Sequence, residues 1–160
     1  MTESKVVEKM KERTEGMATK INNLMLYGIY KVLGAGARGL GNSMGEELLN
    51  VMMEEYGLHF EGSTDPQELL NRLTMVMIET IGFADRGEII INGNNVTLKL
   101  KNPMDLHSIQ LLQKKGIKPV LYPMANAVAS AIKKFSGKNV LIKDIKLFDD
   151  SIEVDMLILG

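Results

Sequence analysis

The sequence predicts an α+β domain in which a helical half packs on a four-stranded antiparallel sheet. In the first half of the chain, apolar residues recur at the spacing of helices. Two later segments instead alternate apolar and polar residues, and a tight-turn signal divides each of them. The length of 160 residues fits one domain, and no internal repeat or linker divides it.

The helical half is expected to contain three helices. The segment 1–16 is charged and poor in apolar residues, which predicts a mobile arm or a frayed helix. A first helix follows over about 17–33, and a second over about 37–56, after a break at Gly34-Ala35-Gly36. Thr64-Asp65-Pro66 opens a third helix, since aspartate caps a helix N-terminus and proline suits its first turn. The single domain is expected to span 17–160.

The second half is expected to hold two hairpins with a helix between them. Asn92-Gly93-Asn94-Asn95 divides the first hairpin, and Asp149-Asp150 divides the second. The four strands are predicted at 88–91, 96–101, 139–148 and 151–159. The main helix between the hairpins fits Pro123–Phe135, and a short one fits 107–114. The order is therefore three helices, a hairpin, a helix and a second hairpin.

Glycine recurs at positions 34, 36, 39, 41 and 45, within a segment that has helical periodicity. A glycine inside a helix costs about 0.5–1 kcal/mol relative to alanine, so this pattern needs a physical reason. Gly41 and Gly45 lie four residues apart and share one side of the second helix. We expect them to admit another helix or a ligand close to the backbone. The segment GAGARG is no dinucleotide fingerprint, because it does not follow a strand.

Composition excludes several classes of protein. A net charge of −1 disfavours a nucleic-acid binder, and the absence of cysteine excludes disulfides, iron–sulfur clusters and cysteine-ligated zinc. No apolar run reaches the ~18 residues of a membrane span, and no signal peptide fits the charged start, so we expect a cytoplasmic protein. The 12 methionines fill the core, or they line a compliant apolar pocket or a dimer face.

The order of the elements and the residues at their joints resemble a known family. The segments are LGNSMGEELL, IETIGF, VTLKLKNPMD and YPMANAVASAIKKF. Over about residues 20–159 the chain resembles the small subunits of the TRAPP membrane-tethering complex and the 4-vinyl-reductase-like ligand-binding domains. The resemblance implies helices that dimerise and enclose an apolar cavity. It carries no catalysis over, because the cysteines of many vinyl-reductase-like domains, and the acylated cysteine of one TRAPP class, have no counterpart here.

The candidate ligand-binding residues are Arg38, Gly41, Gly45 and Tyr122. Arg38 is the charged side chain among the glycines, and its planar guanidinium suits a carboxylate or a phosphate on an apolar ligand. Alternatively, Arg38 points into solvent or pairs with Glu46 or Glu47. Tyr122 lies near a group of lysines that forms either a solvated surface or a basic rim for an acidic ligand or partner: Lys114, Lys115, Lys118, Lys133 and Lys134.

The two histidines suggest neither catalysis nor a metal site. His59 is expected to be a half-buried packing residue. His107 follows Asp105 closely enough to form a hydrogen bond with it, but no recognised nucleophile or cofactor motif accompanies the pair. The spacing of the two histidines matches no zinc-binding motif.

The sequence therefore favours a non-enzymatic binding domain. We expect a homodimer, formed through the helices of 17–56, that binds an apolar or lipid-like small molecule and needs no cofactor. A structural adaptor without a ligand is the alternative. A tetrapyrrole vinyl reductase is least favoured, since the chain has neither a nicotinamide fingerprint nor a cysteine.

Overall fold

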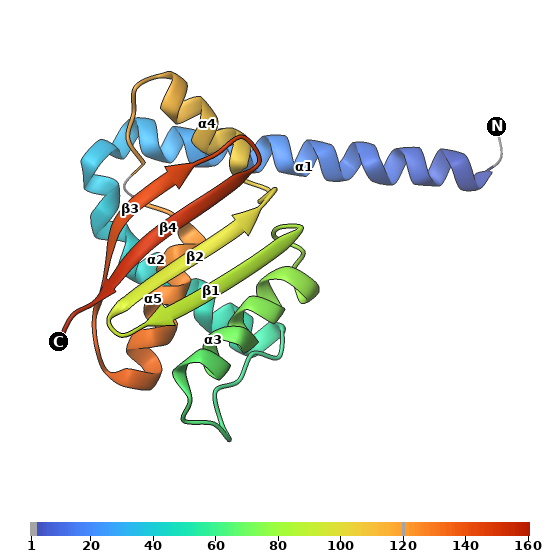
Figure 1. The fold of residues 1–160 in the computed structure, drawn as a ribbon. Helices are drawn as coiled ribbons and strands as arrows, with labels where there is room; N and C mark the ends of the chain where they lie inside the picture. The colour runs from blue at the N-terminus through green and yellow to red at the C-terminus, as the bar shows by residue number, and fades with distance from the viewer. Residues whose placement is uncertain (1–2, 120) are drawn as a thin grey trace.

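Helices pack on a four-stranded antiparallel sheet, as Figure 1 shows. The computed structural model describes residues 3–119 and 121–160. The strands are β1 (Arg86–Asn92), β2 (Asn95–Lys101), β3 (Val140–Leu147) and β4 (Ser151–Ile158), in the spatial order β1-β2-β4-β3. The predicted α+β class and its antiparallel sheet are confirmed.

The first helix is longer than the sequence predicted. Helix α1 spans Glu3–Leu33, and its N-terminal part projects from the rest of the molecule (Figure 1). The helix extends beyond the predicted start near residue 17 because the preceding segment is rich in glutamate, lysine and methionine, which are strong helix formers. Among the described residues, no helix combines the length and the apolar character that crossing a bilayer requires.

The remaining helices lie close to their predicted positions. A 3-10 turn, η1, occupies Gly34–Gly36 and leads into α2 (Ala37–Glu55). Helix α3 (Pro66–Met75) continues into a π-helical turn, η2 (Val76–Thr80). Two helices, α4 (Leu106–Lys114) and α5 (Pro123–Ser136), separate the hairpins. The short helix expected near 107–114 is therefore present.

Capping residues begin α3 and end α5 where the sequence suggested. The Asp65 carboxylate accepts a hydrogen bond of 3.0 Å from the Gln67 backbone N–H, and Pro66 occupies the first turn of α3. Gly137 adopts φ 72° at the end of α5 and donates its N–H to the Lys133 carbonyl at 2.8 Å. A side chain at this φ would be strained, which explains the glycine.

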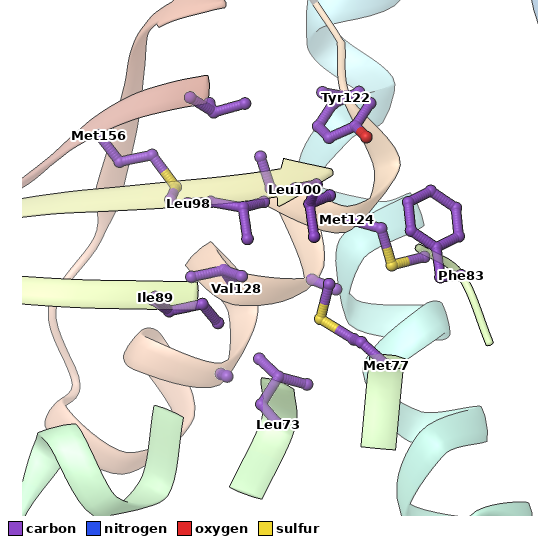
Figure 2. Close-up of a cluster of buried hydrophobic side chains, with 14 of the residues drawn as sticks. Leu73, Met77, Phe83, Ile89, Leu98, Leu100, Tyr122, Met124, Val128 and Met156 are labelled. Carbon is purple, nitrogen blue, oxygen red and sulfur yellow. The ribbon is translucent and has the colours of Figure 1, made fainter. Parts of the chain in front are cut away.

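One face of the sheet packs on α3, η2 and α5 (Figure 2). The side chains form one contiguous apolar cluster that includes Leu73, Met77, Ile89, Leu98, Leu100, Met124, Val128 and Met156. Burial of each large side chain contributes roughly 1.5–3 kcal/mol before entropy is counted. This packed cluster occupies the space between the helices and the sheet. Several methionines are thus core filler.

The glycines of α2 receive helix α5. A Cβ atom at Gly41 would lie 2.5 Å from the Asn126 Nδ2 atom, and one at Gly45 would overlap the Asn126 carbonyl. Both glycines and Asn126 are buried. The expectation of close helix packing through these glycines is confirmed, and the helix they admit belongs to the same chain.

A side-chain amide covers part of one edge of the sheet. The Gln67 amide donates to the Ile89 carbonyl at 2.7 Å and accepts from the Ile91 N–H at 3.1 Å. Gln67 therefore makes the two hydrogen bonds that a neighbouring strand would make with β1. Such cover reduces pairing with a second chain at this edge.

We expect the variant Gly45→Ala to lose about 2 kcal/mol or more in free energy of unfolding, because the added methyl group meets backbone rather than a flexible side chain. The matched control is Gly39→Ala in the same helix, where a Cβ has no atom within 4 Å. The control should be neutral or slightly stabilised, since alanine is the better helix former. Urea unfolding followed by circular dichroism measures both. Equal stabilities would show that α2 and α5 do not need the bare backbone.

Candidate functional site

A cleft of about 460 Å³ opens between α2, α5 and the start of β3. This volume lies within the range of about 300–1,000 Å³ that is usual for small-molecule sites. Its walls come from three parts of the chain. They are Asn42, Glu46, Leu49 and Asn50 of α2, Ala129, Ser130, Lys133 and Lys134 of α5, and Asn139, Val140, Leu141 and Leu159 at the sheet.

The glycine contact positions this cleft. Gly41 and Gly45 bring the backbones of α2 and α5 together, and the next residue after each, Asn42 and Glu46, lines the cleft. Residues 42, 46 and 49 share one side of α2 because they are three or four positions apart. The same helical repeat places Ala129 and Lys133 together on α5. The cleft thus lies directly beside the closest contact between the two helices.

The cleft combines apolar walls with a positively charged rim. Leu49 and Ala129 are buried, and Leu141 and Leu159 present exposed apolar side chains near the sheet. The ammonium groups of Lys133 and Lys134 are exposed and form no ion pair with any described residue. Glu46 is the one acidic residue of the lining, so the rim carries more positive than negative charge. Such a site suits a molecule with an apolar body and an anionic group.

A second polar feature is a buried group of residues between α1, α4 and the start of α5, which we call the acidic cluster. It consists of Asp105, Tyr30 and Tyr122. Asp105 is only 2% exposed, and the Tyr122 hydroxyl donates a hydrogen bond of 3.0 Å to its Oδ1 atom. Burial raises the pKa of Asp105 to about 7, although the hydrogen bond from Tyr122 acts in the opposite direction. Burial also raises the pKa of Tyr30 and of Tyr122, and the nearby Asp105 adds to both shifts. The carboxyl group of Asp105 therefore titrates near neutral pH.

Hydrogen bonds next to this cluster attach α1 to α4. The Asn23 side chain accepts from the Ser108 N–H at 3.0 Å and donates to the Met104 carbonyl at 3.3 Å. The Ser108 hydroxyl donates to the Asp105 carbonyl at 2.7 Å. Asn23 and Ser108 are both buried, so each satisfied polar group fixes the position of α1. The cluster is a structural connection between helices.

The structure does not gather the four predicted site residues into one site. Arg38 is exposed on the first turn of α2, forms no ion pair with Glu46 or Glu47, and lies one turn before Asn42 of the cleft. Gly41 and Gly45 pack against Asn126 of α5 and do not line the cleft, and their role in ligand binding stays a prediction. Tyr122 is buried beside Asp105 and does not line the cleft.

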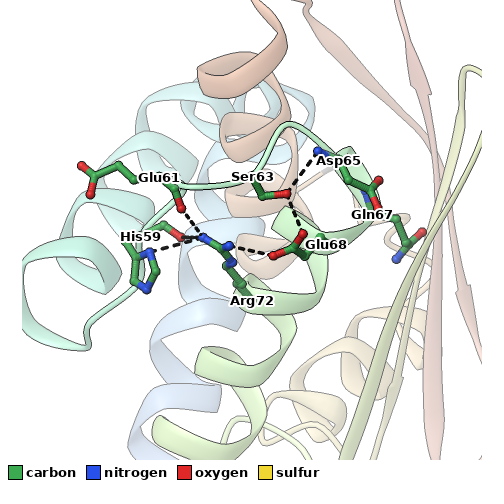
Figure 3. A network of polar contacts seen from close by, with 7 residues as sticks. All are labelled: His59, Glu61, Ser63, Asp65, Gln67, Glu68 and Arg72. Atoms are coloured by element: carbon green, nitrogen blue, oxygen red, sulfur yellow. Dashed lines mark hydrogen bonds and ion pairs between the residues drawn. The ribbon is translucent and has the colours of Figure 1, made fainter.

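Both histidines differ from their predicted environments. Asp105 is bonded to Tyr122, while His107 is exposed and has no hydrogen bond to Asp105. His59 is exposed rather than half-buried, and its Nδ1 lies 3.3 Å from Arg72 Nη1 (Figure 3). The guanidinium of Arg72 also binds the Glu61 carbonyl and the Glu68 carboxylate, each at 2.7 Å. This surface network fastens the loop before α3.

Sequence reasoning missed the buried role of Asp105. The residue follows the strand-ending Asn102-Pro103 and precedes a short helix, which is the usual place of a capping aspartate. In the structure its side chain makes no capping bond and turns instead toward Tyr122. No local pattern signals this choice, because Tyr122 is distant in sequence.

Comparison with known families places most of the chain in one of them. Residues 18–156 match the family described as "Putative rubredoxin C-terminal domain". The chain belongs to this family. The match to the rubredoxin C-terminal domain begins within α1 and ends in β4, so it contains the acidic cluster and every cleft residue except Leu159. No curated protein sequence matches the chain significantly.

The titration of Asp105 predicts a dependence of stability on pH. Its pKa is higher in the folded protein than the ordinary 3.8, so its stabilising contribution is complete below pH ~4 and is lost as the pH rises through about 7. The variant Asp105→Asn should lack this loss. As the pH rises from about 4 to about 7, the free energy of unfolding of the variant minus that of the native protein should increase by up to about 1.4 kcal/mol per pH unit. Above this window the difference should stay constant.

Urea unfolding at several pH values between about 4 and 8 measures this difference. Exposed Asp149→Asn is the control, and its difference from the native protein should show no comparable slope. Each variant is compared with the native protein at the same pH, so contributions that both proteins share cancel. One such contribution is the surface pair Lys146–Asp155, where the ion pair lowers the pKa of the carboxyl group and makes stability rise rather than fall with pH. A flat difference for Asp105→Asn would contradict the raised pKa.

Proposed function

We propose that this chain is a non-catalytic binding domain that acts as a homodimer and holds a small amphipathic anion in the cleft between α2, α5 and β3. The observation that carries the proposal is the composition of the cleft. Buried apolar side chains lie beside Lys133 and Lys134, whose charges have no acidic partner among the described residues. An anionic group near these lysines and an apolar body against Leu49 and Ala129 would satisfy both parts.

The polar lining supports a small molecule of mixed character. Asn42, Asn50 and Asn139 each offer a carbonyl acceptor and an amide donor, and Ser130 adds a hydroxyl. A few such groups on an apolar surface are typical of ligand sites, where they set orientation. Arg38, one turn before Asn42, would extend the positive rim, which keeps its proposed role as an anchor for an anion.

The arrangement of helices on an antiparallel sheet supports the proposed relationship to TRAPP subunits and 4-vinyl-reductase-like domains. We place the ligand in the surface cleft instead of between helices and sheet, because apolar side chains fill that space. The matching family is described as a rubredoxin C-terminal domain. This chain has no cysteine for a four-thiolate iron site, so we assign it binding rather than electron transfer.

A second candidate function is an assembly subunit that needs no ligand. Exposed apolar side chains on the two N-terminal helices favour it: Met17, Ile21, Leu24, Met25, Val32, Leu40 and Val51. Groups of exposed apolar side chains can mark protein contacts in soluble proteins. The assembly and the ligand site use different surfaces, so one protein can have both.

Anilinonaphthalene sulfonate, a fluorescent dye with an apolar body and one negative charge, is a suitable probe of the cleft. We expect saturable binding, weakened by about tenfold in the double variant Lys133→Glu/Lys134→Glu, because both reversed charges act directly on the anion. The matched control, Lys114→Glu/Lys115→Glu, reverses two adjacent exposed lysines at the end of α4. It changes net charge equally and should retain the native affinity within about twofold.

Native mass spectrometry of gently purified protein provides a second measurement. A copurified small mass that the Lys133→Glu/Lys134→Glu variant loses would identify the natural ligand. Equal dye affinities for the two double variants would show that the dye does not use this cleft. Failure of the native protein to bind the dye, together with the absence of any copurified mass, would overturn the ligand proposal.

A further inference from the structure

Helix α1 carries apolar residues on two opposite sides. One side faces the domain and contains the buried residues Asn23, Leu26 and Tyr30. The other side, which we call the α1 stripe, consists of Met17, Ile21, Leu24, Met25, Gly28 and Val32. Leu24 is 66% exposed and Val32 is 83% exposed. Within one chain the stripe therefore faces outward.

Helix α1 extends beyond the part of it that packs on the domain (Figure 1). The helix has 31 residues, and its N-terminal part extends past the rest of the domain (Figure 1). Isolated helices in water are marginally stable, and most helical stability in proteins comes from packing of an apolar face. The contact with α4 supports the C-terminal part of α1 only. A second helix along the stripe would cover the exposed side of this same part, from Met17 to Val32.

Gly28 forms a recess in the middle of the stripe. Apart from the adjacent backbone of α1, no atom of the described residues lies within 4 Å of a Cβ added there, so packing among these residues does not explain this glycine. Glycine in a helix costs about 0.5–1 kcal/mol relative to alanine, which makes an unused recess unfavourable. A large side chain from a second molecule fits against the bare backbone.

The stripe is complementary to itself when two copies run antiparallel. Counted along the helix, Ile21 and Gly28 are equally far from the point midway between Leu24 and Met25. Met17 and Val32 are also equally far from this point. A two-fold axis at this point therefore places Ile21 of one copy beside Gly28 of the other, and Met17 beside Val32. Parallel pairing would instead set Gly28 opposite Gly28 and leave a gap. Isologous contacts of this kind are the commonest basis of soluble dimers.

We propose that two copies of this chain pair through antiparallel α1 helices, with Ile21 of each copy seated over Gly28 of the other. The domain bodies then lie on opposite sides of the helix pair, because the stripe faces away from the buried side of α1. The inference specifies the interface of the homodimer proposed above. It does not depend on the cleft, whose walls contain no residue of α1.

The first test fills the recess. Sedimentation equilibrium of native protein at up to about 100 µM should show a dimer. Gly28→Leu should raise its dissociation constant by about tenfold or more, because the new side chain occupies the space of the partner's Ile21. Gly16→Leu is the control: it is the same chemical change in α1, at an exposed position outside the stripe. It should leave the dissociation constant within about twofold of the native value.

The second test determines the direction of the helices. The chain has no cysteine, so each introduced thiol is the only one in its molecule. Leu24→Cys lies next to the axis and should form a disulfide-linked dimer on mild oxidation. Met17→Cys alone should not cross-link to its own twin. A mixture of Met17→Cys and Val32→Cys proteins should cross-link to each other.

Each outcome separates the alternatives. Rapid cross-linking of Met17→Cys with itself would indicate parallel helices and overturn the proposed register. A monomeric native protein, or equal effects of Gly28→Leu and Gly16→Leu, would overturn the α1 interface. Circular dichroism of both leucine variants checks that they fold. A monomer that still binds the dye would leave the cleft proposal intact, whereas a dimer that binds no dye would reject the cleft and retain this interface.

Discussion

The contact of Gly41 and Gly45 with Asn126 is the constraint on which the rest of the structure depends. Because these two positions lack a Cβ, α5 approaches the backbone of α2 more closely than ordinary side chains allow. Helix α5 is buried along most of its length, with its own small residues turned toward its neighbours. The side of α5 that faces the sheet completes the core, and the side next to α2 forms the cleft. One close approach thus sets both the packing and the candidate site.

The buried acidic cluster has a different relation to stability. Burying the Asp105 carboxyl costs free energy when it is ionised, and one hydrogen bond from Tyr122 offsets only part of that cost. Native domains are only about 5–15 kcal/mol more stable than their unfolded chains, so such a cost is a sizeable part of the total. Here the neighbouring bonds of Asn23 and Ser108 determine where α1 leaves the domain. The Asn23 hydrogen bonds beside the cluster therefore fix the helix that carries the α1 stripe against α4.

The sequence predicted the positions of the helices and strands better than it predicted the tertiary contacts of their side chains. Helix and strand positions follow from local features such as the Asp65 cap, the Gly137 terminus and the Asn-Gly turn, so periodicity was enough. The glycines also predicted a close contact, but they did not indicate whether a ligand, another subunit or α5 would make it. The apolar pattern of α1 could not reveal which positions face the domain, because apolar residues occupy both sides. The sequence offered a basic rim of five lysines near Tyr122, but only tertiary structure shows that Lys133 and Lys134 alone of these line the cleft. The Asp105–Tyr122 hydrogen bond likewise arises only from tertiary structure.

The two proposed surfaces are physically separable. The cleft is bounded by α2, α5 and the end of the sheet, while the stripe belongs to α1, which is held chiefly by α4. Substitutions at sites without shared partners usually have additive effects, so loss of the dimer need not disturb the cleft.

Helix α2 connects the two regions through η1, and its exposed Leu40 and Val51 lie outside the cleft. Any dependence of ligand affinity on dimerisation would therefore have to pass through a movement of α2 against α5. The bare backbone at Gly41 and Gly45 resists such movement, since sliding the helices would drive side chains into the place that Asn126 now fills.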